Sequence, residues 1–334
     1  MAHRGSSRVS LVKLCVLIAT LLALSACSAA TTSSGDHAAR KPTSTPASSP
    51  TPAPSPTASS SPAGGVPQYD HIFWVMEENH SYGDIVGSSS APYINETLIP
   101  TGSLATNDSA ITHPSVNNYL ADVSGQTYGG ITDSCTPSNT SCSTNAWNLF
   151  DGLTASGKTW ATYEESMPSS CYTSYQSGDY VERHDPAPYF NQIRNNASRC
   201  AQDKPFTSLA TDLGSAATTP TFSFITPNVQ NDMHDGTVNQ ADTWLKNNLP
   251  TVFNSPAWKT QHSLLILTED ENDGSAGNIV PLLFVSSDGS VPAGRTDSAT
   301  YTQYDTLRTI EDSLGVTPGG PGDKAGRDET GMFG

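Results

Sequence analysis

Four short apolar runs stand out along the chain, each of strand length and each bounded by polar residues. They cover residues 71–76 (HIFWVM), 221–226 (TFSFIT), 263–268 (SLLILT) and 281–286 (PLLFVS). A strand that is apolar on both faces is typical of a mostly parallel sheet covered by helices on both sides. The pattern therefore predicts an α/β fold with such a sheet at its centre.

Two other segments have helical spacing. After Pro114, which suits a first helical turn, apolar residues recur three or four positions apart until Gly125 ends the pattern: Val116, Tyr119, Leu120 and Val123. A second, amphipathic helix is expected over residues 306–314, with Gly315 as its C-cap. The glycine-rich tail from Pro318 is expected to be loose.

The first 67 residues have a different pattern. Basic residues precede an apolar run at 14–24 that is short for a bilayer span, which indicates a signal peptide. The run ends in LSAC, which resembles the lipobox of bacterial lipoproteins, so we expect residues 1–27 to be processed and Cys27 to be lipidated. The mature protein would then be anchored at the extracellular face of the cell envelope, or secreted if the signal is an ordinary one.

Residues 28–67 contain mostly Ser, Thr, Pro and Ala, so they predict a disordered spacer. Residues 68–334 have the composition of one globular domain. Five of the 16 basic and one of the 32 acidic residues precede this domain, which leaves it a net charge of −20. Nucleic acid and anionic membrane surfaces are therefore not expected to bind it.

Four cysteines remain in the expected domain: Cys135, Cys142, Cys171 and Cys200. In an exported protein four cysteines most simply form two disulfides, and three pairings are possible. We favour the local pairing, Cys135 with Cys142 and Cys171 with Cys200. A zinc site is the alternative, although the spacing lacks the usual short Cys pairs.

Polar residues directly follow three of the apolar runs. Glu78 and Asn79 follow the first run, the motif NDMHDG at 231–236 follows the second, and Asp270 and Glu271 follow the third. Ligands of parallel sheets bind beyond the carboxyl ends of the strands. Carboxylates gathered there need a cation, and oxygen ligands with one histidine suit Mg, Ca, Mn or a mixed Zn/Fe site. Taken singly, each group could instead form an Asx-turn or lie on the surface.

Ser115 begins the first expected helix within the motif THPS. The N-terminus of a helix favours an anion, so a phosphate could bind there and a Ser115 alkoxide would be stabilised. Serine at this position could also simply cap the helix. His184, in a polar loop bounded by proline, is either a surface residue or a group that protonates a leaving alkoxide.

Together these segments resemble the bacterial phosphoesterase family of secreted acid phosphatases and phosphatidylcholine-type phospholipases C, within the alkaline-phosphatase-like superfamily. The resemblance runs from Tyr69 to Val316, and its motifs are ENHS at 78–81, THPS at 112–115, HDP at 184–186, NDMHDG at 231–236 and TEDENDG at 268–274. The short domain looks more like the acid phosphatases, some of which are similar to enzymes that dephosphorylate phosphoinositides. The resemblance implies an alkaline-phosphatase-like fold.

The resemblance also implies roles for single residues. Ser115 matches the nucleophile that attacks phosphorus while touching the metal, with Thr112 as its local rival. His184 matches an active-site histidine and is the candidate general acid. Asp232, His234 and Asp235 match a further ligand or phosphate-contacting group; we place His234 with the catalytic residues. The expected ligands of one or more divalent metal ions of unknown identity are Glu78, Asn79, Ser115, Asp232, Asp235, Asp270 and Glu271.

Two residues depart from the family pattern. Gln303 stands where the family usually has His, so activity could be weaker or the metal different if that His binds metal or phosphate. Glu269 replaces the usual Trp before the acidic pair, and its carboxylate would either tighten cation binding or lie outside the site.

The sequence as a whole predicts an exported, metal-dependent phosphomonoesterase of the acid phosphatase type that acts through a phosphoserine. Its expected substrate is a phosphorylated small molecule or a phospholipid head group, phosphoinositides included. The alternatives are a phosphodiesterase of the phospholipase C type and a non-catalytic binding lipoprotein on the same fold.

Overall fold

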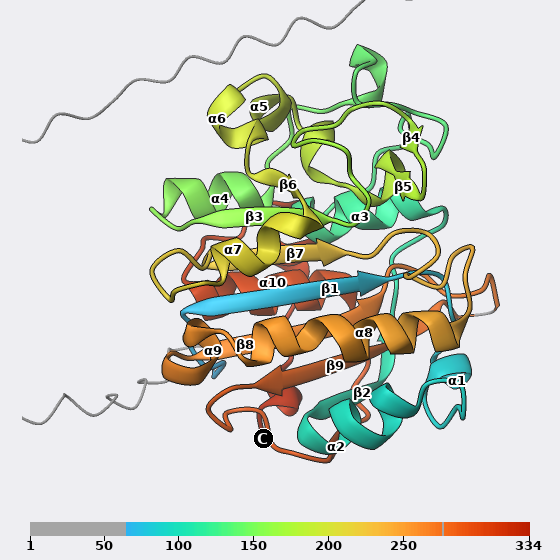
Figure 1. The fold of residues 1–334 in the computed structure, drawn as a ribbon, viewed down its shortest axis with the longest axis vertical. Coiled ribbons are helices and arrows are strands. Elements are labelled where there is room, and N and C mark those ends of the chain that lie inside the picture. The colour runs from blue at the N-terminus through green and yellow to red at the C-terminus, as the bar shows by residue number, and fades with distance from the viewer. Residues whose placement is uncertain (1–64, 276) are drawn as a thin grey trace, which may run out of the picture. The chain divides into compact units, whose positions relative to one another are not determined.

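The computed structural model describes residues 65–275 and 277–334 (Figure 1). The expected signal peptide, the lipidated Cys27 and nearly all of the expected spacer lie outside the described residues. Val66, two residues before the expected start of the domain, is fully buried. Within the described part of the chain, no helix is both long enough and apolar enough to cross a membrane.

A nine-stranded sheet forms the centre of the described part, in the order β10-β2-β9-β8-β1-β7-β3-β6 with β11 beside β2. Neighbouring strands are parallel except at β9, which runs antiparallel to both β2 and β8. This confirms the mostly parallel sheet, and the four expected strands are β1, β7, β8 and β9. The strands are β1 His71–Glu77, β2 Ser103–Ser109, β3 Trp160–Glu164, β6 Asp203–Pro205, β7 Phe222–Thr226, β8 Ser263–Glu269, β9 Ile279–Ser286, β10 Arg295–Asp297 and β11 Tyr301–Thr302.

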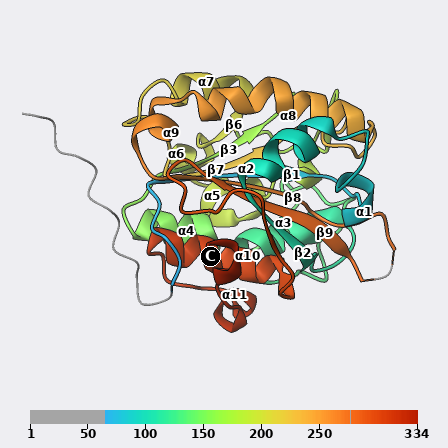
Figure 2. The same cartoon turned by 90° about the horizontal axis from the view of Figure 1, so that it is seen from below.

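Helices cover both faces of this sheet, as Figure 2 shows. One face carries α1 Tyr82–Ile85, the π-helix η1 Ile94–Leu98, α2 Ile99–Thr101, α7 Leu209–Asp212, α8 Val238–Phe253 and α9 Pro256–Thr260. The other carries α3 Ser115–Ser124, α4 Leu149–Ala155, α10 Gln303–Leu314 and α11 Pro321–Ala325. The remaining short elements are η2 Thr140–Cys142, β4 Gln176–Ser177, β5 Tyr180–Val181, η3 Glu182–His184, η4 Ala187–Tyr189, α5 Asn191–Arg194, α6 Ala197–Cys200, η5 Phe206–Ser208 and η6 Thr330–Met332.

The strands divide their apolar side chains between two cores because successive side chains point to opposite faces. In β1, Ile72, Trp74 and Met76 belong to the core shared with α3 and α10. Phe73 and Val75 belong to the core shared with α8. A run that is apolar at every position therefore follows directly from helices on both faces.

Two helix starts differ in detail from the expectation. Pro114 is the N-cap of α3 rather than part of its first turn, and Gly125 ends the helix with a left-handed φ of 68°. The second expected helix, α10, begins at Gln303, before the expected 306, because the Asp305 carboxylate accepts hydrogen bonds from Thr302 at the helix start. Gly315 is its C-cap, as expected.

The expectation of a loose tail from Pro318 is wrong. The segment forms α11 and η6, and Met332 is fully buried in the core on the α10 side. The Asp323 carboxylate accepts hydrogen bonds from the N–H groups of Gly319 and Gly320, which fixes the glycine-rich turn. Glycine content alone misled the expectation because it reports local freedom and not long-range packing.

The local disulfide pairing is confirmed. Cys135 is bonded to Cys142, with their Cα atoms 5.4 Å apart, and Cys171 to Cys200, with their Cα atoms 5.2 Å apart. Both separations lie in the usual range for disulfides.

Candidate active site

The acidic residues at the ends of β1 and β8 are divided between the two faces of the sheet. The two strands are parallel neighbours, and their register pairs Glu77 with Glu269. Because side chains alternate along a strand, the next residues, Glu78 and Asp270, lie on the opposite face, toward α3. Both of these side chains are fully buried.

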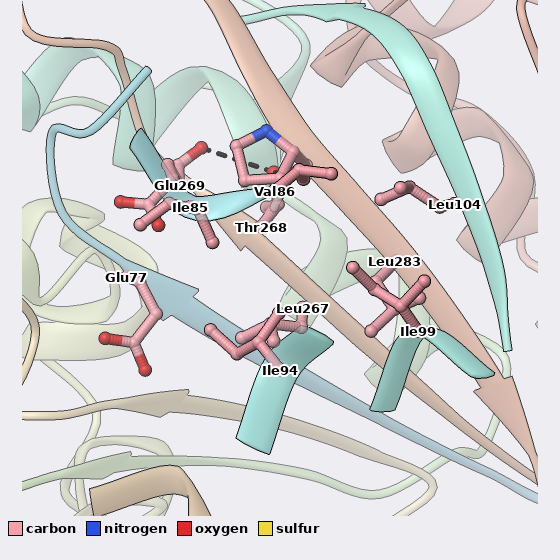
Figure 3. Close-up of a pocket in the computed structure, with 11 residues that line it drawn as sticks. Glu77, Ile85, Val86, Ile94, Ile99, Leu104, Leu267, Thr268, Glu269 and Leu283 are labelled. Atoms are coloured by element: carbon pink, nitrogen blue, oxygen red, sulfur yellow. Dashed lines mark hydrogen bonds between the residues drawn. The ribbon is translucent and has the colours of Figure 1, made fainter. Parts of the chain in front are cut away.

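Glu77 and Glu269 line a separate pocket on the α8 side (Figure 3). Its other walls are mainly apolar, including Ile94 and Leu267, and its empty volume is about 310 Å³. The Glu269 carboxylate accepts a hydrogen bond from the His80 N–H at 3.3 Å. Of the two alternatives for this departure from the family pattern, the structure favours a carboxylate that lies outside the group around Ser115.

Ser115 is the first residue of α3 and only 2% exposed. Its hydroxyl donates a hydrogen bond to Glu78 Oε2 at 3.1 Å, so its side chain does not cap the helix. The Val116 N–H instead donates to Asp133 Oδ1 at 3.1 Å, so this helix-end donor is already used and is not open to a phosphate. The hydroxyl of the rival Thr112 donates to the backbone oxygen of His113.

His184 lies in η3 with its ring between two carboxylates. Nδ1 is 3.1 Å from Asp232 Oδ2, and Nε2 is 3.2 Å from Glu78 Oε1. The ring stacks on Tyr119, with centroids 5.4 Å apart and planes inclined by 2°. Burial lowers the pKa of His184, and the nearby Arg183 and His234 lower it further. A neutral imidazole carries one N–H and so can donate to only one of the two neighbouring carboxylates.

The NDMHDG motif places its three candidate residues differently. Asp232 is fully buried, and its Oδ1 accepts from the His234 N–H at 2.8 Å. The His234 ring lies with Nδ1 2.8 Å from Asp235 Oδ1 and Nε2 3.4 Å from an Arg183 nitrogen. Since the guanidinium only donates, Nε2 accepts and the Nδ1–H is directed at Asp235. The Asp235 side chain is 55% exposed, and the structure does not bring it to Glu78.

Glu271 and Asn79 lie at the edge of the group. Glu271 Oε2 accepts from Asn118 Nδ2 at 2.9 Å and lies 3.1 Å from His113 Nδ1. Asn79 contacts Asp270 through its backbone, whose N–H donates to Asp270 Oδ1 at 3.4 Å. The expected ligands Glu78, Asp232, Asp270 and Glu271 therefore gather near Ser115, with the Asn79 side chain half-buried beside them.

Sequence reasoning gave no role to three residues that support the group: Asn118, Tyr119 and Arg183. Asn118 also holds the backbone of Thr112 through two hydrogen bonds of 2.9 Å. It lies three positions after Ser115 on α3 and so faces the same side of the helix, a spacing that could have identified it. Arg183 is the cation next to this acidic group, and its position beside His184 was the available signal.

The Gln303 side chain bonds to the backbone of two segments and does not face the carboxylates around Ser115. It is fully buried, and its Nε2 donates to the backbone oxygens of Glu269 and Asp270 at 2.9 and 3.0 Å. Its Oε1 accepts from the Ile111 N–H at 3.2 Å. One amide side chain thus joins the segment that carries Asp270 to the segment that leads to Ser115.

The residues fit a divalent cation. Glu78 Oε1 and His184 Nε2 face each other at 3.2 Å, and neither has a hydrogen-bond donor when the ring proton is directed at Asp232. Asp270 Oδ2 is also buried without a partner. Glu78, His184 and His234 each offer one ligand atom, and these atoms lie within 4.8 Å of one another. A cation would satisfy both facing acceptors, and a mixed oxygen and nitrogen set suits a divalent metal.

The electrostatics agree with this fit. Burial raises the pKa of Glu78, Asp232 and Asp270 well above the usual carboxyl range, and repulsion from neighbouring acids raises it further. Burial also raises the pKa of Glu271 to about 8, with Asp133 contributing. A bound cation would reverse these shifts because it favours the ionised carboxylates.

The sequence around these residues matches a known protein family. The model of the phosphoesterase family matches residues 102–317, which include Ser115, His184, Asp232 and Asp270. The chain belongs to the phosphoesterase family. It is accordingly a phosphoric ester hydrolase, which confirms the expected enzyme class.

Relatives of this phosphoesterase carry related names. A phosphatidylinositol-3-phosphatase of Mycobacterium tuberculosis is 35% identical over 255 residues, covering 76% of this chain and 80% of that protein. An acid phosphatase of Aspergillus fumigatus is 29% identical over 260 residues, covering 74% of this chain and 55% of that protein. A phosphate-repressible acid phosphatase of Penicillium chrysogenum is 35% identical over 231 residues, covering 66% and 53%. The phosphoesterase thus spans little more than half the length of these fungal relatives.

Solved structures confirm the fold. A protein of the alkaline phosphatase superfamily from Vibrio parahaemolyticus superposes with a TM-score of 0.56 at 15% identity, covering 83% of this chain and 74% of that chain. The lipoteichoic acid synthase LtaP from Listeria monocytogenes gives 0.54 at 12% identity, covering 83% and 78%. At these identities the likeness concerns the fold alone, and it confirms the expected alkaline-phosphatase-like architecture.

Proposed function

We propose that this phosphoesterase is an exported, metal-dependent phosphomonoesterase of the acid phosphatase type with Ser115 as its nucleophile. The observation that carries the proposal is the buried hydrogen bond from the Ser115 hydroxyl to Glu78, within a group of carboxylates at one sheet edge. A serine used only to cap a helix would direct its hydroxyl to the helix backbone instead.

The chain's own residues would act as follows. Glu78 Oε2 would orient the Ser115 hydroxyl and accept its proton as the Ser115 oxygen attacks phosphorus in line; the bond to the leaving alcohol breaks, and water later hydrolyses the phosphoserine. His184 holds Asp232 through Nδ1, and its Nε2 lies 3.2 Å from Glu78 Oε1, where it can serve as a further ligand of a cation. His234, whose side chain is 25% exposed, would pass a proton to the leaving alcohol from Nε2 once both ring nitrogens carry protons, while its Nδ1–H stays directed at Asp235. Arg183 supplies positive charge for the phosphate.

A divalent cation, when bound, would lower the effective pKa of the attacking hydroxyl and attract the non-bridging oxygens. Glu78, Asp232, Asp270 and Glu271 would hold it together with His184 Nε2, with Ser115 and Asn79 beside them; we assign Asp235 instead to orienting His234. The substrate we propose is a phosphate monoester of a small molecule or of a phospholipid head group. Phosphoinositides are included because of the name of the mycobacterial relative.

Hydrolysis of p-nitrophenyl phosphate across pH tests this proposal. We expect turnover that is lost on chelation and restored by one or more divalent metals. Ser115→Ala should lower kcat by at least about 1,000-fold, because the covalent route is removed. Thr112→Ala is the matched control and should keep most of the activity. Acid quenching during turnover should trap phosphate on Ser115.

Three outcomes would contradict the proposal. Substantial turnover by Ser115→Ala would place the nucleophile elsewhere. Faster hydrolysis of bis-p-nitrophenyl phosphate than of the monoester would indicate a phospholipase C-type phosphodiesterase. A folded protein that binds metal but hydrolyses neither ester would be a binding lipoprotein on this fold.

We also propose that the protein is exported and lipid-anchored through Cys27, on the basis of the lipobox-like LSAC and the two disulfides. In a bacterial host, the full chain should partition into the detergent phase of Triton X-114. Cys27→Ala should move it to the aqueous phase or leave the precursor uncleaved. Equal partition of both proteins, with equal processing, would exclude the anchor.

A further inference from the structure

Three buried carboxyl groups form a second cluster, outside the group around Ser115. Glu164 ends β3, Asp203 begins β6, and Asp185 directly follows η3. Their exposed fractions are 2% or less. Each offers one ligand atom, and the three atoms lie within 4.8 Å of one another. Oxygen ligands at 2.3–2.6 Å from one Ca²⁺ ion lie no more than about 5 Å apart, so this spacing suits a shared ion.

A hydroxyl group donates a hydrogen bond to one carboxyl oxygen of each aspartate, and the second oxygen receives none. Thr162 donates to Asp203 Oδ1 at 2.8 Å, and Tyr180 donates to Asp185 Oδ2 at 2.9 Å. The second oxygen of each aspartate, and Oε1 of Glu164, are buried without any hydrogen-bond partner. A buried acceptor without a donor is costly, and here one such atom comes from each of the three residues.

No basic side chain neutralises the cluster within the described residues. Lys204, the neighbour of Asp203, pairs with Asp212 at 2.7 Å, and Arg183, close to Asp185 in sequence, contacts His234. Three carboxylates this close cannot all be ionised without a compensating positive charge.

We propose that Glu164, Asp185 and Asp203 bind a Ca²⁺ ion. The donor set consists of carboxylate oxygens, which hard cations prefer. Ca²⁺ fits better than Mg²⁺ because Mg²⁺ usually keeps several of its waters, and the three carboxyl groups are at most 2% exposed. A crevice lined by Glu164, Tyr180 and Thr226 reaches the cluster; its empty volume of about 160 Å³ is too small for an organic ligand.

The ion would connect the ends of β3 and β6 to the segment that carries His184. Asp185 follows His184 directly, and the Thr226 hydroxyl donates to the His184 backbone oxygen at 3.4 Å. The Cys171 N–H, beside the Cys171–Cys200 disulfide, donates to the Asp203 backbone oxygen at 3.1 Å. Calcium would thus fix the position of the histidine that lies between Glu78 and Asp232, without touching substrate itself.

Calcium content measures the site directly. The full-length protein is stripped with chelator, dialysed against Ca²⁺ at pH 7.5 and analysed for bound calcium per chain. We expect Asp203→Asn, which keeps the shape and the Thr162 contact, to bind one ion fewer than the wild type. Glu311→Gln, a buried carboxyl outside both clusters, is the matched control and should bind the wild-type number. Equal calcium content in wild type and Asp203→Asn would overturn the proposal.

Thermal unfolding separates this site from the one at Ser115. In Asp270→Asn, which is expected to lose turnover, Ca²⁺ should still raise the Tm by several degrees over chelator. Adding Glu164→Gln to that variant should abolish the increase. No increase in Asp270→Asn would mean that shared protons rather than calcium stabilise the cluster. An increase that persists in the double variant would place the calcium elsewhere, and either result would overturn the proposal. This measurement also decides the matter if Asp203→Asn does not fold, and it does not depend on activity.

Discussion

Glu311 makes the stability of the domain depend on pH in a way that one substitution can isolate. The residue lies on α10 with no exposed surface, and neither carboxyl oxygen receives a hydrogen bond. Asp323 of α11 faces it, and on its own helix Arg308 is already paired with Asp312 at 2.8 Å. Burial raises the pKa of Glu311 to about 10, and the charge of Asp323 adds to the shift. Folded Glu311 therefore stays protonated at neutral pH and can donate its proton to Asp323.

The magnitude follows from linkage. The unfolded chain releases this proton near the ordinary pKa of 4.5, whereas the folded domain keeps it up to about pH 10. The contribution of Glu311 is therefore fully present below about pH 4.5 and is lost at about 1.4 kcal/mol per pH unit as the pH rises toward 10. At pH 8 the loss amounts to at most about 5 kcal/mol, and relaxation around the buried group reduces it to about 2–4 kcal/mol.

Glu311→Gln removes the titration while keeping the shape and an N–H donor for Asp323. We expect urea unfolding to show a difference of less than about 1 kcal/mol between variant and wild type at pH 5. At pH 8 the variant should be more stable by about 2–4 kcal/mol. Both proteins are measured with chelator so that metal binding does not contribute. A difference that is the same at both pH values, or a variant that is less stable at both, would refute the reasoning.

Three further predictions concern single side chains. Gln303→Leu should lower the free energy of unfolding by about 2–4 kcal/mol in urea titrations, because three backbone hydrogen bonds lose their partner; an unchanged midpoint would contradict its joining role. Met332→Ala should cost about 2–5 kcal/mol in the same assay, whereas Tyr175→Ala at an exposed position should cost little; equal effects would mean the tail is loose after all. Asn118→Ala should lower kcat by about 10- to 100-fold and weaken metal binding, since it releases Glu271; kinetics and metal titration that match the wild type would argue against this.

Much of the fold was predictable because burial on both faces leaves a direct mark on the sequence. The runs that became β1, β7 and β8 are mostly apolar and buried at every position, and acids after them met at one edge as parallel strands require. The antiparallel direction of β9 was not predictable, since an apolar run carries no information about the direction of its neighbours.

Several residues of the candidate site were predictable from the sequence, and their contacts were less so. Glu78 and Glu77 are adjacent in sequence, yet they point to opposite faces, and only the register with β8 shows which acid lies near Ser115. Asp232 and Asp235 could not be separated because both belong to one turn whose path depends on tertiary contacts. The cluster of Glu164, Asp185 and Asp203 had no local signature, since each acid comes from a different segment of ordinary polarity.

The buried amide of Gln303 limits how far the two segments that carry the candidate site can separate. It is bonded at once to the segment after β8 and to the segment before α3, so separating these segments breaks three hydrogen bonds. A cost of about 3 kcal/mol keeps the separated state below about 1% of molecules. The segments that carry Ser115 and Asp270 therefore separate only rarely. The Asp235 side chain is 55% exposed, so we expect local opening at the turn of His234 and Asp235 while the proposed nucleophile Ser115 stays aligned.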